Sequence, residues 1–89
     1  MEHFLSLDVG TTSVKVALFD REGDLVASSL REYALHTPSQ DIVELDPETY
    51  WRCCREGTRE VLSKANVPKA KIVSVGVCSQ GETLIALDR

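Results

Sequence analysis

The residues best suited to bind a ligand lie in one stretch near the N-terminus, from Asp8 to Lys15, which reads DVGTTSVK. Its centre is a glycine followed by small hydroxyl residues: Gly10, Thr11, Thr12 and Ser13. Such a turn lets a ligand approach the main chain closely and leaves N–H and hydroxyl groups to face phosphate oxygens. Asp8 suits a hydrated magnesium ion, which takes one or two protein carboxylates and substrate phosphates, and Lys15 adds a positive charge. The stretch predicts phosphate binding, with an ordinary hairpin turn as the alternative.

Two β-prone runs must position this turn. His3 to Leu7 precedes it and Val14 to Phe19 follows it, so the pattern predicts a hairpin. The second run is apolar on both faces, which indicates a strand covered on both sides. The acidic loop Asp20 to Asp24 predicts a second hairpin, leading to a third strand over Leu25 to Leu35. The serines in that strand favour a more exposed position toward an edge of the sheet.

A helix is predicted after a polar loop at Thr37 to Asp41. Asp46 is a good N-cap, Pro47 fits the first helical position, and the helix should run from Pro47 to about Ala65. The side chains expected to face the core are Tyr50, Trp51, Cys54, Val61, Leu62 and Ala65. Gly57 inside the helix costs about 1 kcal/mol relative to alanine, which indicates close packing against the sheet. Asn66 and Pro68 end the helix.

Lys71 to Cys78 is predicted to be a buried strand, parallel to the first because a helix crosses between them. Polar residues follow it, and open α/β sheets place ligands at the carboxyl ends of such strands. Thr83 to Leu87 is β-prone again and would end the chain as an unmatched edge strand. We therefore expect the chain to be a fragment of a larger protein.

Composition excludes several classes of function. The 89 residues allow one domain at most, and a net charge of −4 provides no basic field for nucleic acid. No apolar run is long enough to span a bilayer and no secretory signal pattern occurs, so we expect a cytoplasmic protein without membrane contact. The three cysteines match no zinc or redox spacing. Reduced thiols are expected, with Cys54 and Cys78 as small apolar core residues.

The linked motifs resemble the N-terminal part of the FGGY carbohydrate kinases, which include xylulose, gluconate and glycerol kinases. The resemblance covers essentially the whole chain through three segments: DVGTTS at 8–13, VELDP at 43–47, and VGVCSQGET at 75–83. It implies an α/β fold of the ribonuclease-H-like (actin-like ATPase) type, present in part. The expected order is three antiparallel strands, a helix, a parallel strand and the start of a further strand. Residues 1–89 would form the N-terminal part of the first kinase domain.

The resemblance also implies roles for particular residues. Asp8 corresponds to a magnesium-associated aspartate, Gly10 to Ser13 to the first loop that binds ATP phosphates, and Lys15 to an arginine near the terminal phosphate in glycerol kinases. The sugar or polyol would contact the segment Gln80, Gly81, Glu82 and Thr83, where the Glu82 carboxylate accepts hydrogen bonds from substrate hydroxyls. The catalytic base is expected downstream, so no catalytic residue falls within this chain, and the chain alone should be inactive.

Departures from the pattern and two other classes of protein leave the function partly open. Glycerol kinases carry an arginine where this chain has Gly81, and xylulose kinases carry Met-His-Gly where it has Gly81 to Thr83, so the substrate is an undetermined sugar or polyol. The same phosphate loop occurs in actin-like and chaperone ATPases. The second alternative class is a small binding domain whose edge strand pairs with a second copy of the chain.

Overall fold

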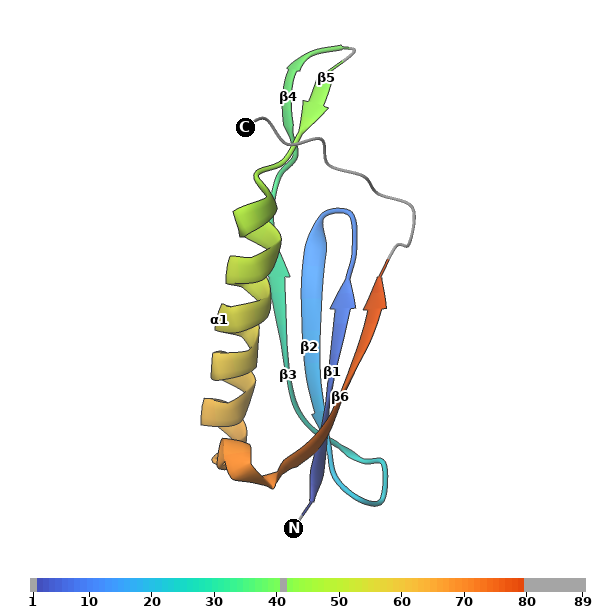
Figure 1. Ribbon diagram of the computed structural model, residues 1–89, viewed down its shortest axis with the longest axis vertical. Helices are drawn as coiled ribbons and strands as arrows, with labels where there is room; N and C mark the ends of the chain where they lie inside the picture. Colours follow the sequence, from blue (N-terminus) through green and yellow to red (C-terminus); the bar gives the residue numbers. More distant parts are fainter. Residues whose placement is uncertain (1, 41, 80–89) are drawn as a thin grey trace.

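The computed structural model describes residues 2–40 and 42–79. Figure 1 shows one helix lying along one face of a sheet, with a separate small hairpin beyond its N-terminal end. The strands are β1 (His3–Val9), β2 (Ser13–Phe19), β3 (Leu25–Glu32), β4 (His36–Ser39), β5 (Ile42–Glu44) and β6 (Ile72–Ser79). The helices are α1 (Pro47–Ala65) and the short 3-10 helix η1 (Lys69–Lys71).

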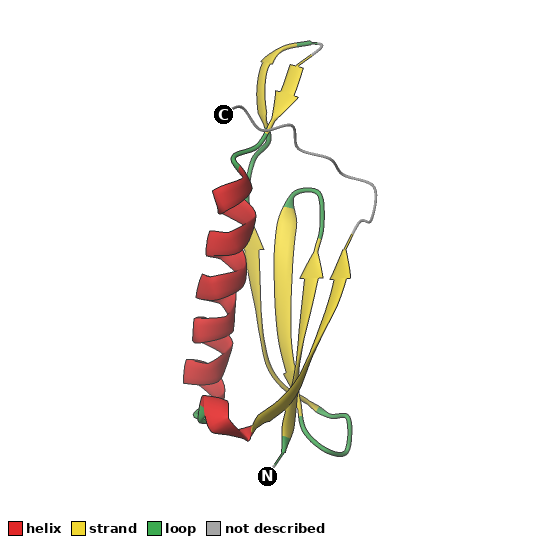
Figure 2. Ribbon diagram, viewed as in Figure 1, coloured by secondary structure: helices red, strands yellow, loops and turns green. Residues whose placement is uncertain are grey.

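The main sheet has the strand order β3-β2-β1-β6, as Figure 2 shows. β1 and β2 are antiparallel, as are β2 and β3, whereas β6 runs parallel to β1. The expected hairpins, the position of β3 at an edge, and the parallel strand after the helix are therefore confirmed. The further strand expected at 83–87 lies outside the described residues.

The core lies between the sheet and α1, which packs on β2 and β3. Strand alternation turns every second side chain of β2 toward the helix, and the buried cluster consists of Leu5, Val14, Val16, Leu18, Cys53 and Val61. The cover expected on both faces of β2 is incomplete within residues 2–40 and 42–79, because Lys15 on the face opposite α1 is exposed. That face is where a ligand can reach the sheet.

Local sequence signals fix α1 at the bounds predicted from the sequence. The Asp46 carboxylate accepts a hydrogen bond from the Glu48 N–H at 3.0 Å, and Asn66 caps the C-terminus in the left-handed conformation, with φ of 54°. Gly57 packs as closely as expected, since a Cβ there would lie 2.9 Å from Val16 Cγ2. The Ser29 hydroxyl donates to the Gly57 carbonyl at 3.1 Å and joins β3 to α1.

The predicted loop at Thr37 to Asp41 is wrong, because His36–Ser39 forms β4 and pairs with β5. Every side chain of β4 is exposed, so the strand needs no apolar alternation, and Pro38 is tolerated in a strand that has only one neighbour. β3 ends at Glu32, three residues before the expected Leu35. Its partner β2 begins at Ser13, which pairs with Glu32, so the ladder has no further residues to pair.

Several burial predictions are also wrong. Seven of the eight residues of β6 are exposed because α1 covers β2 and β3 while β6 lies at an edge of the sheet. Cys78 is consequently exposed, and the buried cysteine is Cys53 while Cys54 is half-buried. Trp51, expected in the core, is 61% exposed. In the part of the chain that the structure describes, no helix is long and apolar enough to cross a membrane.

Candidate functional site

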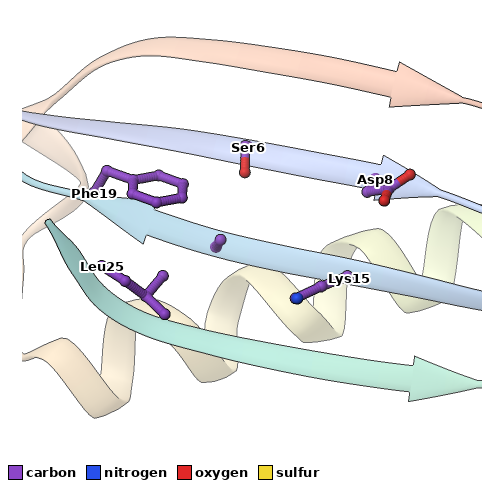
Figure 3. A pocket seen from close by; sticks show the side chains of 6 residues that line it. Ser6, Asp8, Lys15, Phe19 and Leu25 are labelled. Atoms are coloured by element: carbon purple, nitrogen blue, oxygen red, sulfur yellow. The ribbon is translucent and has the colours of Figure 1, made fainter. Parts of the chain in front are cut away.

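Asp8 and Lys15 are cross-strand partners in the β1–β2 ladder, one pair before the turn that joins the strands. Their neighbours Val14 and Val16 face α1, so alternation places both charged side chains on the opposite face of the sheet. Figure 3 shows the two side chains on adjacent strands beside a pocket. The pocket has a volume of about 250 Å³ and is lined by Ser6, Asp8, Lys15, Ala17, Phe19 and Leu25.

A second pocket of about 330 Å³ lies between β1 and β6. It shares Ser6 and Asp8 with the first, and the remaining lining residues are Leu7, Gly76, Val77 and Cys78. The Asp8 carboxylate is therefore accessible from two adjoining pockets. From this position, one carboxylate can contact a ligand bound on either side of β1.

The turn from Gly10 to Ser13 is held by main-chain and side-chain hydrogen bonds. The Gly10 N–H donates to the Ser13 carbonyl at 2.8 Å, and the Tyr33 N–H donates to the Thr12 carbonyl at 2.9 Å. The Tyr33 hydroxyl donates to the Gly10 carbonyl at 2.6 Å. Gly10 does not adopt the left-handed conformation. Among the described glycines, Gly23 is the one that does. A Cβ at Gly10 would lie 3.3 Å from the Ser13 carbonyl oxygen, so the glycine keeps the turn compact.

The charges of the site are available for a ligand. Within residues 2–40 and 42–79, the ion pairs join Arg31, Glu56, Glu60 and Lys64 at the β3–α1 contact, and none includes Asp8 or Lys15. The hydrogen bond from Lys64 holds the pKa of the Glu60 carboxyl below its usual range. An unpaired carboxylate and an unpaired ammonium on one face can bind a cation and an anion at the same place.

The described residues fit a magnesium ion only in combination with a phosphate ligand. They contain no cluster of three or more histidine, cysteine or acidic side chains that could hold a metal by themselves. Mg²⁺ does not need such a cluster, because it keeps several waters and takes one or two carboxylates together with phosphate oxygens. The exposed carboxylate of Asp8, beside the turn, has the right donor chemistry for this mode of binding.

The structure brings together six of the residues predicted from the sequence: Asp8, Gly10, Thr11, Thr12, Ser13 and Lys15. The predicted substrate residues Gln80, Gly81, Glu82 and Thr83 lie outside the described residues. The strand that precedes them ends beside the turn, because Ser79 of β6 pairs with Val9 of β1.

Tyr33 is the site residue that the sequence analysis did not identify. It follows β3 by one residue and contacts the turn more than twenty residues before it in the chain. Its ring lies against Tyr50 of α1 with centroids 5.4 Å apart and planes at 85°. Burial, together with the proximity of Tyr50, raises the pKa of Tyr33 to about 12. No local sequence pattern distinguishes a tyrosine that packs in a core from one that holds a turn.

The family model and the curated relatives indicate one family. Residues 3–89 match the N-terminal domain of the FGGY family of carbohydrate kinases. Glycerol kinase from Rhodospirillum centenum is 38% identical over 85 residues, which cover 96% of this chain and 17% of that protein. Glycerol kinase from Thermococcus gammatolerans is 38% identical over 90 residues, covering all of this chain and 18% of that protein. The chain thus spans less than a fifth of the length of these curated relatives.

Solved structures of the same class have this fold. A ligand-bound xylulose kinase from Lactobacillus acidophilus aligns with a TM-score of 0.79 and 29% identity, over 90% of this chain and 16% of that one. Plasmodium falciparum glycerol kinase with ADP aligns with a TM-score of 0.74 and 28% identity, over 93% of this chain and 17% of that one. The mixed sheet with one helix is thus part of the actin-like, ribonuclease-H-like fold, as expected.

Proposed function

Because the chain belongs to the FGGY family of carbohydrate kinases, we propose that the full-length protein transfers the terminal phosphoryl group of ATP to a sugar or polyol hydroxyl. The relatives named above are kinases of glycerol and xylulose, and one of them was solved with ADP. Residues 1–89 form the N-terminal part of the first kinase domain and contribute one part of the active site.

The observation that carries this proposal is the Asp8–Lys15 pair, which the single pair Val9–Val14 separates from the end of the hairpin. In phosphoryl transfer the protein mainly positions the reactants and stabilises the charge on the phosphoryl oxygens. Asp8 would hold Mg²⁺ together with phosphate oxygens, and the positive charge of Lys15 would stabilise the transferring group. The turn binds the phosphates through its backbone N–H and hydroxyl groups.

The sugar binds at Gln80, Gly81, Glu82 and Thr83, which follow directly after the strand that ends beside the turn. Glu82 accepts hydrogen bonds from substrate hydroxyls, an interaction that is strong because the acceptor is ionised. A ligand without the matching hydroxyl leaves the carboxylate unpaired and is rejected. Substrate recognition and phosphate binding would thus meet at one end of the sheet.

The 89 residues alone should catalyse no transfer. The chain covers 17% to 18% of the first relatives, and the general base and the rest of the nucleotide site are expected in the remainder of the protein. Transfer requires both reactants in line with each other, which part of a site does not provide. A steady release of ADP by the isolated 89 residues that depended on both ATP and a sugar would contradict this.

The test is ADP release by the full-length protein across a panel of pentoses, ketoses, sugar acids and polyols. We expect one substrate class to be phosphorylated, Asp8→Ala to abolish turnover, and Glu82→Ala mainly to raise KM for the sugar. Asp24→Ala is the matched control, since Asp24 is an exposed acid in the β2–β3 loop at the other end of the sheet (Figure 1). ATP turnover without stimulation by any sugar would instead favour an actin-like or chaperone-type ATPase.

A further inference from the structure

Tyr33 makes its contacts with the turn from two different groups. Its N–H donates to the Thr12 carbonyl at 2.9 Å, and its hydroxyl donates to the Gly10 carbonyl at 2.6 Å, with the Ser13 carbonyl also 3.5 Å from the hydroxyl. Tyr33 thus holds the carbonyl groups of two turn residues, Gly10 and Thr12, whereas the Ser13 carbonyl accepts mainly from the Gly10 N–H at 2.8 Å. The contact joins segments 23 residues apart in the chain.

The hydrogen bond to Gly10 also determines where an N–H group points. A trans peptide is planar, with its C=O and N–H on opposite sides, and the described residues contain no cis peptide bond. Because the Gly10 carbonyl points at the Tyr33 hydroxyl, the Thr11 N–H of the same peptide plane points away from Tyr33. A reversed peptide would direct the carbonyl oxygen the other way, where it would repel an anion.

The direction of that N–H follows from where Tyr33 lies. Tyr33 packs against the buried core and, through its ring, against Tyr50 of α1. Asp8 and Lys15 lie on the opposite face of the sheet. The Gly10 carbonyl therefore points toward the helix layer, and the Thr11 N–H points away from it. Tyr33 therefore holds the turn from the helix side and leaves the side of Asp8 and Lys15 open to a ligand.

We propose that Tyr33 is a positioning residue for the nucleotide: its hydroxyl and its N–H hold the Gly10 and Thr12 carbonyl groups, so that the turn keeps the single conformation in which it meets the ATP phosphates. The proposal rests on the kinase function proposed above. Tyr50 supports the Tyr33 ring from α1, so the orientation of the turn depends on the contact between the sheet and the helix. Burial, together with the proximity of Tyr50, raises the pKa of Tyr33 to about 12, so the hydroxyl remains a hydrogen-bond donor at higher pH than an ordinary tyrosine does.

The first experiment compares Tyr33→Phe with Ser29→Ala in the full-length protein. Each variant removes one hydroxyl that donates to a glycine carbonyl, but the Ser29 bond joins β3 to α1 at Gly57, away from the turn. We expect Tyr33→Phe to raise KM for ATP about fivefold, the effect of one lost hydrogen bond, and to leave KM for the sugar unchanged. Ser29→Ala should leave both KM values unchanged. Equal KM values for ATP in the two variants would overturn the proposal.

The second experiment does not depend on turnover. Amide hydrogen exchange of the peptide containing Gly10 to Ser13 is measured without nucleotide in the wild-type protein and both variants. Faster exchange in Tyr33→Phe than in the other two proteins is expected, and unchanged exchange contradicts the positioning role. If the wild-type protein shows no sugar-dependent ATP turnover, the proposed kinase function fails, while the exchange rates still decide whether Tyr33 holds the turn.

Discussion

Asp8 and Lys15 face each other across the β1–β2 ladder, one residue pair before the turn, and neither forms an ion pair within residues 2–40 and 42–79. An acid and a base opposite each other usually attract, and a cross-strand pair of opposite charges contributes about 0.2–1 kcal/mol. Here both groups instead line a shared pocket of about 250 Å³. This arrangement suits an acid that binds a metal and a base that binds a phosphate.

Lys15→Met should lower kcat of the full-length kinase about 100-fold while changing KM for the sugar little, because a charge near the transferring group acts mainly in the transition state. The measurement is steady-state kinetics with ATP and the identified sugar. Lys69→Met is the control, since Lys69 is exposed in η1 and distant in sequence from the turn. An unchanged kcat in Lys15→Met would show that the ammonium is only solvated.

Gly57→Ala should destabilise the protein even though alanine is the better helix former. The added Cβ would lie 2.9 Å from Val16 Cγ2, closer than real contacts allow, and 3.0 Å from Ser29 Oγ, closer than most real contacts. Overpacking of this kind costs about 1–3 kcal/mol, which exceeds the gain of about 1 kcal/mol in helix propensity. Thermal unfolding of the full-length protein measures the net effect. The control Ser63→Ala, at an exposed position of α1, should be neutral or slightly stabilising.

Glycerol should be a poor substrate, although the curated relatives named above are glycerol kinases. The resemblance places an arginine of glycerol kinases at the position of Gly81, beside the substrate carboxylate Glu82. Gly81→Arg should therefore raise kcat/KM for glycerol relative to the preferred sugar. The measurement is the ratio of kcat/KM for glycerol to kcat/KM for the preferred sugar, determined in the wild type and in the variant. A wild-type enzyme that prefers glycerol would refute the prediction.

The sequence predicted the elements whose signals are local. α1 carries its own start and stop in Asp46 and Asn66, and the β1–β2 hairpin carries its own turn, so both were placed correctly. The site residues Asp8 and Lys15 were found for the same reason, since one short motif contains them both. Their roles toward magnesium and phosphate remain predictions.

The errors arose where the answer depends on distant neighbours. The apolar pattern of β6 resembles that of a buried strand, but its burial depends on what covers it, and α1 packs on β2 and β3 instead. The choice between Cys53 and Cys54 depends on how far α1 is rotated about its axis, which two adjacent thiols cannot reveal. Tyr33 was missed because its partner, Gly10, lies 23 residues away.

The stability of the protein at high pH should depend on Tyr33. Burial, and then the proximity of Tyr50, raises the pKa of Tyr33 from its ordinary value of 10.0 to about 12, because the charged tyrosinate is disfavoured in the folded state. The folded state therefore binds the proton more tightly than the unfolded state. The resulting stability is fully present below pH 10 and is lost as pH rises from 10 toward 12. Thermal unfolding of wild type and Tyr33→Phe between pH 9 and pH 12 measures this contribution.

The two melting curves should converge with increasing pH. Wild type is more stable than Tyr33→Phe at pH 9, where the hydroxyl still donates to Gly10, and the difference shrinks once that proton is lost. Groups that titrate in the same range without contacting Tyr33 are common to both proteins and cancel in the difference, whereas Tyr50 does not cancel, because its charge acts on Tyr33. Both proteins are therefore also compared in a Tyr50→Phe background. Because deprotonation also removes the donor that holds the turn, hydrogen exchange at Gly10 to Ser13, corrected for the intrinsic pH dependence, should accelerate in wild type alone. A stability difference that stays constant from pH 9 to pH 12 would show that the hydroxyl is not a buried donor.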